Sequence, residues 1–305
     1  MSPTTLQGAM AMVGCCTIWG LSPLYYKYLD FVPPLELLAH RTLWSLVFFG
    51  LIQAVRGRLH IVVQALRPGR PLVLCALAAM LISVNWFVFI SAIQGGRGVE
   101  ASLGYYIFPL VAVAIGRVVF GERLGPLAWL AIALACLGVT LLTVGLRAAP
   151  WVALILAISF GLYGAVKKTL LVGALASVTA EVTLLAPLAL AWLWFGVQGA
   201  GAFGQGWAEA GLLIFSGPLT AVPLMLFGTA SRGLTMASVG IIGYLNPTLQ
   251  FICAAFIFGE VVTGWHLVAF AFIWTALALY SGAMLRRPRK RAQVAGTFDA
   301  VPPSR

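Results

Sequence analysis

Long apolar runs alternate with short polar connections along almost the whole chain. Each run is close to the roughly 20 residues that an α-helix needs to cross the hydrocarbon core of a bilayer. Gly and Pro stand at many of the connections, such as Pro33-Pro34 and Gly125-Pro126. The pattern predicts ten membrane-spanning helices, over residues 7–27, 35–55, 71–93, 99–120, 126–146, 150–170, 177–197, 209–230, 236–258 and 264–285.

The composition agrees with lipid as the solvent. Of the 305 residues, 61% are hydrophobic and only 9% are charged, and the mean hydropathy is +1.00. A soluble domain carries about 25% charged residues, so too few charges remain here to cover a globule. Residues 1–7 contain no Lys or Arg, so we do not expect a cleaved signal peptide. We predict an all-α integral membrane protein with no separate soluble domain.

The basic residues indicate how the helices are oriented. With the N-terminus in the cytoplasm, fifteen of the nineteen Lys and Arg residues fall on the cytoplasmic side. Lys27, Arg97 and Arg147 fall on the other side, and Arg41 lies within a span. Because cytoplasmic loops are enriched in Lys and Arg, we expect a multi-pass protein of the cell inner (plasma) membrane with both termini cytoplasmic. This sorting accounts for the net charge of +11 without a nucleic-acid partner.

The two halves of the chain resemble each other. A shift of 138 residues aligns identical residues in the fourth and ninth spans: Tyr106 with Tyr244, Pro109 with Pro247, and Gly121-Glu122 with Gly259-Glu260. Nearer the start, a shift of 141 places Lys27 on Lys168. Each half holds five predicted spans, so the second enters the membrane in the opposite orientation. We predict a five-helix repeat over residues 1–147, an inverted repeat over 148–285, and a basic cytoplasmic tail over 286–305.

Several short motifs resemble the RarD group of the drug/metabolite transporter superfamily, whose members carry two EamA-type repeats. The most specific are Glu36 to Arg41 with Trp44-Ser45, Asn85-Trp86, Glu100 to Tyr105, Val222 to Leu224, Pro247-Thr248 and Gly259-Glu260. The resemblance covers nearly the whole chain. It implies a ten-helix fold and a permease that moves small metabolites or drug-like amphipathic compounds by alternating access. The family often has Asn before the proline of the fourth span, whereas this chain has Phe108 there and Asn246 before the proline of the ninth.

Arg41 is the strongest candidate for a substrate-binding residue. It lies about six residues into the second predicted span, or roughly 9 Å deep, and Arg does not lose its charge. Ionisable groups inside spans are expensive and mark functional sites by default. We expect Arg41 to bind a carboxylate or phosphate, which favours an anionic or zwitterionic substrate. The alternatives are that Arg41 extends to the interface or pairs with Glu36.

Three further ionisable residues are candidates for coupling or gating. Glu36 and His40 lie four residues apart and therefore share a helix face. Since His titrates near neutral pH, this pair could carry a proton; a structural hydrogen bond is the alternative. Glu181 holds the matching early position of the seventh span, at the opposite membrane face. We therefore expect Glu36 and Glu181 to act as paired gates, with the proton as a candidate coupling ion.

A set of polar and aromatic residues lies well inside the predicted spans. Side chains of this kind, with an apolar body and a polar tip, suit an amphipathic substrate. Belts of Trp and Tyr at the membrane interface are the alternative. With His40 and Arg41, the predicted substrate-binding residues are Asn85, Trp86, Tyr105, Tyr106, Tyr163, Tyr244 and Asn246.

Other functional classes find little support in the sequence. No span contains Asp, no HExxH motif is present, and none of the five Cys forms a CxxC, so we expect neither an enzyme nor a metal or other cofactor. A membrane enzyme, or a signalling or structural membrane protein, remains the alternative to a transporter. No Walker A motif is present, so we expect transport to be driven by a gradient or by exchange. The substrate, the direction of transport and the oligomeric state stay open.

Overall fold

The computed structural model describes residues 3–121, 124–146, 150–197, 201–234, 239 and 242–286, and these form helices and connections without a strand. The main helices are α1 (Pro3–Tyr28), α2 (Pro34–Val55), α3 (Leu59–Ala65), α4 (Arg70–Gln94), α5 (Gly98–Phe120), α6 (Pro126–Leu146), α7 (Trp151–Thr169), α8 (Ala174–Ala191), α9 (Trp207–Gly233), α11 (Leu245–Ile252) and α12 (Gly264–Arg286). The π-helical turns η1 (Trp192–Gly196) and η3 (Cys253–Ile257) extend α8 and α11. A short 3₁₀ helix, η2 (Ala202–Gly204), precedes α9. The predicted all-α membrane fold is confirmed.

Nine helices in the described part of the chain are long and apolar enough to cross a membrane. They coincide with nine of the ten predicted spans. The ninth span, predicted over 236–258, appears as a shorter apolar helix over Leu245–Ile257, and most of 236–241 lies outside the described residues. Glu122 and the tail beyond Arg286 also lie outside them. The short helix α3 was not predicted, and it forms within a segment expected to be a loop.

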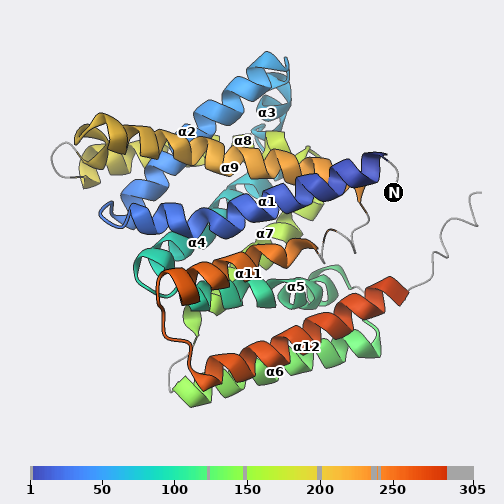
Figure 1. The fold of residues 1–305 in the computed structure, drawn as a ribbon. Helices are drawn as coiled ribbons and strands as arrows, with labels where there is room; N and C mark the ends of the chain where they lie inside the picture. The colour runs from blue at the N-terminus through green and yellow to red at the C-terminus, as the bar shows by residue number, and fades with distance from the viewer. Residues whose placement is uncertain are drawn as a thin grey trace, which may run out of the picture.

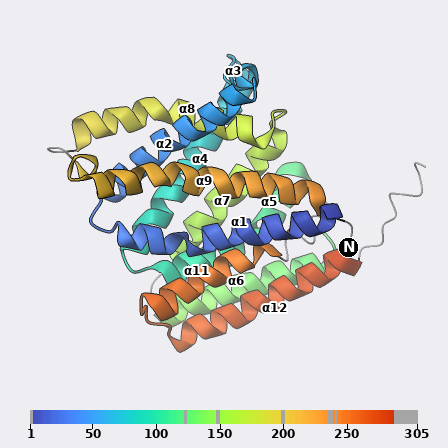
Figure 2. The ribbon, with the colours of Figure 1, turned by 45° about the horizontal axis from the view of Figure 1, so that its top comes forward.

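The helices lie side by side in a bundle, with α6 and α12 paired along one edge (Figures 1 and 2). In both views the start of α1 and the end of α12 lie at the same end of the bundle, as an even number of spans requires. Small residues allow close contact between helices. A Cβ at Gly104 of α5 would come within 2.8 Å of the carbonyl oxygen of Ala153 on α7. One at Gly217 of α9 would come within 2.7 Å of the carbonyl oxygen of Trp44 on α2.

Each inner helix packs against at least two others. α9 packs against both α1 and α2, and α4 packs against both α7 and α8. α5 packs against α7 and α11, and α11 also packs against α1. The beginning of α5 is fixed by the carboxylate of Glu260, which accepts the backbone N–H of Gly98 at 2.7 Å and that of Val99 at 2.8 Å. A negative group at a helix N-terminus satisfies N–H groups that have no partner within the helix.

Candidate functional site

Arg41 lies about two turns into α2 and is 7% exposed. The helix begins at Pro34, whose fixed φ suits the first helical position. From there α2 runs between α8 and α9, against both of which it packs. The guanidinium therefore lies inside the helix bundle. It does not extend to the lipid or to water, as the interface alternative would require.

The partners of Arg41 come from three other helices. Its Cζ lies 4.0 Å from the ring centroid of Trp86 on α4 and 5.7 Å from that of Tyr26 on α1. Its Nε donates a hydrogen bond to Oγ1 of Thr220 on α9, at 3.0 Å. We call Arg41, Trp86, Tyr26 and Thr220 the Arg41 cluster. It joins α1, α2, α4 and α9 through one positive charge and two aromatic faces.

Arg41 forms no ion pair with any carboxylate of the described residues. The alternative that it pairs with Glu36 therefore does not hold in this structure. Helix geometry gives the reason, since residues five apart are separated by about 140° around an α-helix. The contacts of Arg41 are thus with aromatic rings and hydroxyl groups, and not with a carboxylate of the described residues.

Glu36, at the start of α2, holds the loop that leads into α9. Its Oε1 accepts the backbone N–H of Ala202 at 2.6 Å, and both residues are buried. The next residue, Phe203, stacks on His40 with ring centroids 5.2 Å apart and on Trp44 with centroids 6.1 Å apart. We call residues 201–204 the strap. The strap lies against the N-terminal half of α2, which contains Arg41.

Glu36 and His40 share a helix face, as predicted from their spacing, and both contact the strap. Within the described residues they do not hydrogen bond to each other: the carboxylate binds the strap backbone and the imidazole ring stacks on Phe203. The structural alternative of a direct Glu36–His40 hydrogen bond is therefore not found. A coupling role for His40 stays a prediction.

Asn85 and Tyr105 form one hydrogen-bonded group. The amide nitrogen of Asn85, on α4, donates to the carbonyl oxygen of Leu156 and to Oγ of Ser159 on α7, both at 3.0 Å. The hydroxyl of Tyr105, on α5, donates to Oδ1 of Asn85 at 3.0 Å. Asn85 is 1% exposed, and both the nitrogen and the oxygen of its amide are hydrogen bonded. The residue therefore links α4, α5 and α7.

The predicted residues of the ninth span lie at the contact between α5 and α11. Tyr106 shares a hydrogen bond of 2.6 Å with Thr248, whose hydroxyl also donates to the carbonyl oxygen of Tyr244 at 2.7 Å. Oδ1 of Asn246 accepts a hydrogen bond from Gln250 at 3.0 Å. No contact joins this group to Arg41 within the described residues. The structure thus separates the predicted binding set into smaller groups.

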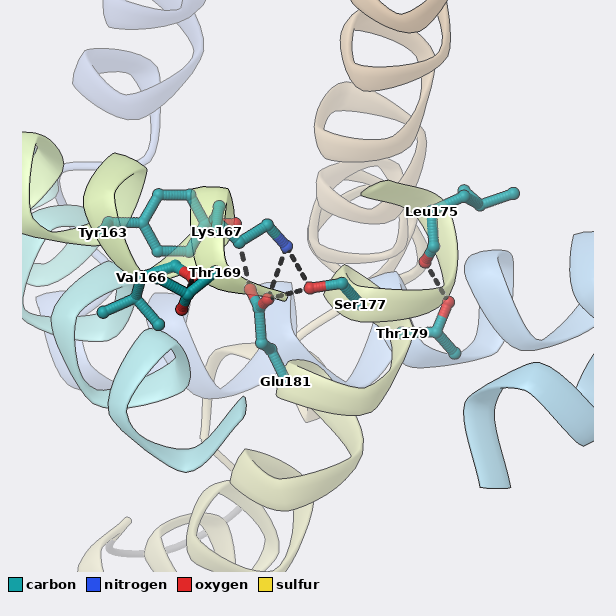
Figure 3. Close-up of polar contacts among 8 residues, drawn as sticks. All are labelled: Tyr163, Val166, Lys167, Thr169, Leu175, Ser177, Thr179 and Glu181. Carbon is teal, nitrogen blue, oxygen red and sulfur yellow. Dashed lines mark hydrogen bonds and ion pairs between the residues drawn. The ribbon is translucent and has the colours of Figure 1, made fainter. Parts of the chain in front are cut away.

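Tyr163 belongs to a polar group around Glu181 (Figure 3). Oε1 of Glu181, on α8, accepts hydrogen bonds from Lys167 of α7 at 2.6 Å and from Ser177 at 2.7 Å. Oε2 accepts the hydroxyl of Tyr163 at 3.0 Å, and Lys167 also donates to Ser177. Glu181 is 1% exposed. We call these four residues the Glu181 cluster.

Comparison with known proteins agrees with the motifs. The EamA-like transporter family matches residues 6–144. An uncharacterized transporter of Pseudomonas aeruginosa is 43% identical over 90% of this chain and 93% of its own length. The protein RarD of Streptomyces exfoliatus is 38% identical over 98% of this chain and 96% of its own length. The chain belongs to the RarD group of the drug/metabolite transporter superfamily.

The fold of this RarD-type protein also occurs in a solved crystal structure that is 21% identical in sequence. That structure covers 94% of this chain and 99% of its own, with a TM-score of 0.59. At this sequence identity, the similarity between the two structures establishes a shared fold and not a shared function. With relatives that are named transporters and nine membrane-length helices in the described residues, the chain is a multi-pass membrane transporter of the drug/metabolite type.

Sequence reasoning missed several residues that build these groups in the RarD-type transporter. Lys167 is one of the fifteen basic residues placed on the cytoplasmic side, but it also forms an ion pair with the buried carboxylate of Glu181. Phe203 lies in a Gly-rich loop and Thr220 is a lone hydroxyl within an apolar span. Their partners lie far away in the chain, as with Arg41 and Thr220, so no local pattern could reveal them. No three His, Cys, Asp or Glu side chains of the described residues lie close enough together to hold a metal ion.

Proposed function

We propose that this transporter carries a small organic anion or zwitterion with an apolar or aromatic part, and that Arg41 binds its acidic group. The observation that carries the proposal is a buried guanidinium among membrane-spanning helices without a carboxylate partner in the described residues. A planar guanidinium matches the two oxygens of a carboxylate or phosphate. Trp86, stacked on the same group, offers an aromatic surface beside it.

The contacts within the protein are enough to keep Arg41 buried when no ligand is bound. A charge in the middle of a spanning helix costs at least about 2–3 kcal/mol on insertion scales. A desolvated cation–π contact such as that with Trp86 offsets about 2 kcal/mol, and the Thr220 hydrogen bond adds a similar amount at most. Arg41 is therefore tolerated without a substrate. An acidic substrate would supply the negatively charged partner that no carboxylate of the described residues provides.

The helix contacts support alternating access between two inverted halves. In the proposed repeat, the counterparts of α1, α2, α4, α5 and α6 are α7, α8, α9, α11 and α12. Exchanging each helix for its counterpart turns the contact of α1 with α9 into that of α7 with α4, which is also present. In the same way, α5 with α7 corresponds to α11 with α1, and α2 with α9 corresponds to α8 with α4. Three pairs map onto themselves, namely α2 with α8, α5 with α11, and α6 with α12. Gly121 and Gly259, aligned by the repeat, have φ of 64° and 70°. Inverted repeats are typical of alternating-access transporters, whose substrates bind between the halves.

The orientation completes the proposal. With both termini in the cytoplasm and the protein in the inner membrane, the strap lies on the outer side and the Glu181 cluster on the cytoplasmic side. Arg41 then lies beneath the strap, on a helix that packs against α8 of the other half. Glu36 and Glu181 would each control one side of the membrane, in keeping with their matched positions in the two halves.

Arg41→Lys tests the proposal because it keeps the charge and loses the paired donors of guanidinium. The variant should fold, and its binding of carboxylates should weaken roughly tenfold to hundredfold, since a hydrogen bond to a charged group is worth about 1.5–3 kcal/mol. The measurement is uptake and binding by purified protein in liposomes. The probes are a panel of aromatic and aliphatic carboxylates, each with the neutral amide of the same size.

Arg97→Lys is a matched control. Arg97 also lies over a Trp ring, with its Cζ 4.5 Å from the centroid of Trp151, but it pairs with Glu100 at 2.8 Å. This control should leave carboxylate binding unchanged. Equal binding of carboxylates and their amides, or equal loss in both variants, would show that Arg41 is not the anchor. Hydrolysis of the amides without any flux would favour the membrane-enzyme alternative.

A further inference from the structure

The connection between α2 and α4 carries a concentration of positive charge that no nearby acidic residue in the sequence balances. The chain has no Asp or Glu between Glu36 and Glu100. Two arginines lie on either side of α3, and all four side chains are exposed: Arg56, Arg58, Arg67 and Arg70. None of the four forms an ion pair within the described residues. These charges therefore face the surroundings of the protein without a counter-ion from the described part of the chain.

The protein covers only one side of α3. This helix is seven residues long, whereas isolated helices shorter than about 12–15 residues are marginal in water. Its buried residues are Val62 and Ala65, which belong to an apolar cluster with Cys75 of α4 and with Ala176 and Ala180 of α8. The contact with the bundle is therefore small and apolar.

A second apolar face of α3 is exposed. Leu59 and Val63 are 47% and 61% exposed. Because successive residues of an α-helix are about 100° apart, these two lie on one face, beside the buried face of Val62. His60 and Gln64 are exposed on the side opposite Val62. An apolar face next to a polar one is the arrangement of a helix that lies in the plane of a membrane interface.

α3 lies at the edge of the bundle, where lipid can reach it (Figures 1 and 2). It follows the end of α2, so in the orientation proposed above it lies on the cytoplasmic side. It packs against α2 and α4 of the first proposed repeat and against α8 of the second. Its counterpart in the second repeat is the connection of residues 197–206, which contains the strap and has no Lys or Arg. The positive charge is thus a feature of the first half alone.

We propose that α3 and its four flanking arginines form a docking surface for anionic phospholipids of the cytoplasmic leaflet. Leu59 and Val63 enter the boundary between headgroups and acyl chains, and the arginines bind lipid phosphate groups, whose oxygens suit a planar guanidinium. Charge complementarity identifies the partner, because basic clusters next to a spanning helix are attracted to anionic lipid. α3 is only about 10 Å long, so the arginines at its two ends can reach neighbouring headgroups.

Hydrogen–deuterium exchange tests the proposal on the full-length protein, in nanodiscs that hold one copy each. One set of discs contains phosphatidylcholine alone, and the other contains equal parts of phosphatidylcholine and phosphatidylglycerol. Peptides covering residues 59–66 should exchange at least about fivefold more slowly in the anionic discs, which is the effect of a single arginine near an anionic surface. High salt should reduce the difference, because ions screen exposed charges. Residues 201–206, which carry no basic side chain, should exchange at the same rate in both.

Two kinds of variant separate the charge from the apolar face. Replacing all four arginines with Gln should remove the lipid dependence, and replacing them with Lys should keep most of it, because the attraction is mainly electrostatic. Val63→Ser should weaken the dependence through the loss of apolar contact with lipid. Leu171→Ser is the matched control, since Leu171 is also an exposed apolar residue on the proposed cytoplasmic side but lies outside α3. This control should leave the lipid dependence unchanged.

The comparison of lipids in the wild-type protein decides the matter even where a variant fails to insert. Equal exchange of residues 59–66 in the two kinds of disc would overturn the proposal. Protection by soluble glycerol phosphate, added to phosphatidylcholine discs, would also overturn it, because it would show a site for a free anion. An equal change at residues 201–206 would show a general effect of lipid on the bundle, with the same consequence. None of these results depends on carboxylate binding at Arg41, so the proposed function is tested separately.

Discussion

Replacing Glu36 with Gln should loosen the strap while α2 stays folded. The carboxylate accepts the N–H of Ala202 at 2.6 Å, a short distance that fits a charge-assisted hydrogen bond. Gln has nearly the same shape and keeps an oxygen acceptor. The change therefore removes the negative charge and leaves the aromatic contacts of Phe203 in place.

The magnitude follows from the two kinds of hydrogen bond. A bond to a charged group contributes about 1.5–3 kcal/mol and a neutral one about 0.5–1.5 kcal/mol. The loss is then about 1–1.5 kcal/mol, which corresponds to a roughly 5- to 10-fold larger population of the open strap. Phe203, stacked on His40 and Trp44, contributes about 0.5–1.5 kcal/mol per aromatic contact. Phe203→Ala should therefore open the strap to a similar or larger extent.

Exchange of the Ala202 amide measures this population directly. Ala202 is buried, so its N–H exchanges only when the strap lifts from Glu36. Peptides covering residues 201–206 should exchange roughly 5- to 10-fold faster in Glu36→Gln at a fixed pH. Phe195→Ala, at an exposed position of η1 beyond α8, is the control and should leave the rate unchanged. An unaltered Ala202 rate in a folded Glu36→Gln protein would refute the assignment of Glu36 to the strap.

Three further predictions follow from the structure. Asn85→Leu should lower the free energy of unfolding by about 1–3 kcal/mol, because it leaves Ser159 and Tyr105 with fewer hydrogen-bond partners. Thermal unfolding measures this loss, and Asn246→Leu should lower the free energy of unfolding by less. Glu260→Gln should destabilise by a similar 1–3 kcal/mol through the start of α5, as exchange of α5 amides would reveal. A reporter active only in the cytoplasm should work after residue 285 and fail in the 147–150 loop; the reverse would refute the topology.

The membrane-spanning helices could be predicted from the sequence because the bilayer imposes their length and composition. Nine predicted spans coincide with helices of the described residues, and Arg41 is buried within one of them, as expected. The helix face shared by Glu36 and His40 also followed from their spacing. These predictions depend only on local periodicity, which a single sequence displays directly.

The partners of the candidate residues could not be predicted, because they come from distant segments. Thr220 is 179 residues from Arg41, and Ala202 is 166 residues from Glu36. The distribution of Lys and Arg predicts only that Lys167 lies on the cytoplasmic side, because it does not show which carboxylate faces this lysine. The polar-aromatic set was assembled by residue type alone, and the structure distributes it over separate helix contacts. Asn85, for example, is engaged between α4 and α7.

The difference between the two halves explains how similar carboxylates could have different roles. In the proposed repeat, the shift of 141 that aligns Lys27 with Lys168 also aligns Tyr26 with Lys167. The second half therefore has a cation that pairs with Glu181, whereas the first half has a phenol ring that lies near Arg41. Without a neighbouring lysine, Glu36 binds a backbone N–H of the strap, a group that does not titrate. The Glu181 carboxylate therefore joins α8 to α7 through an ion pair, whereas the Glu36 carboxylate joins α2 to the strap through a hydrogen bond to the backbone.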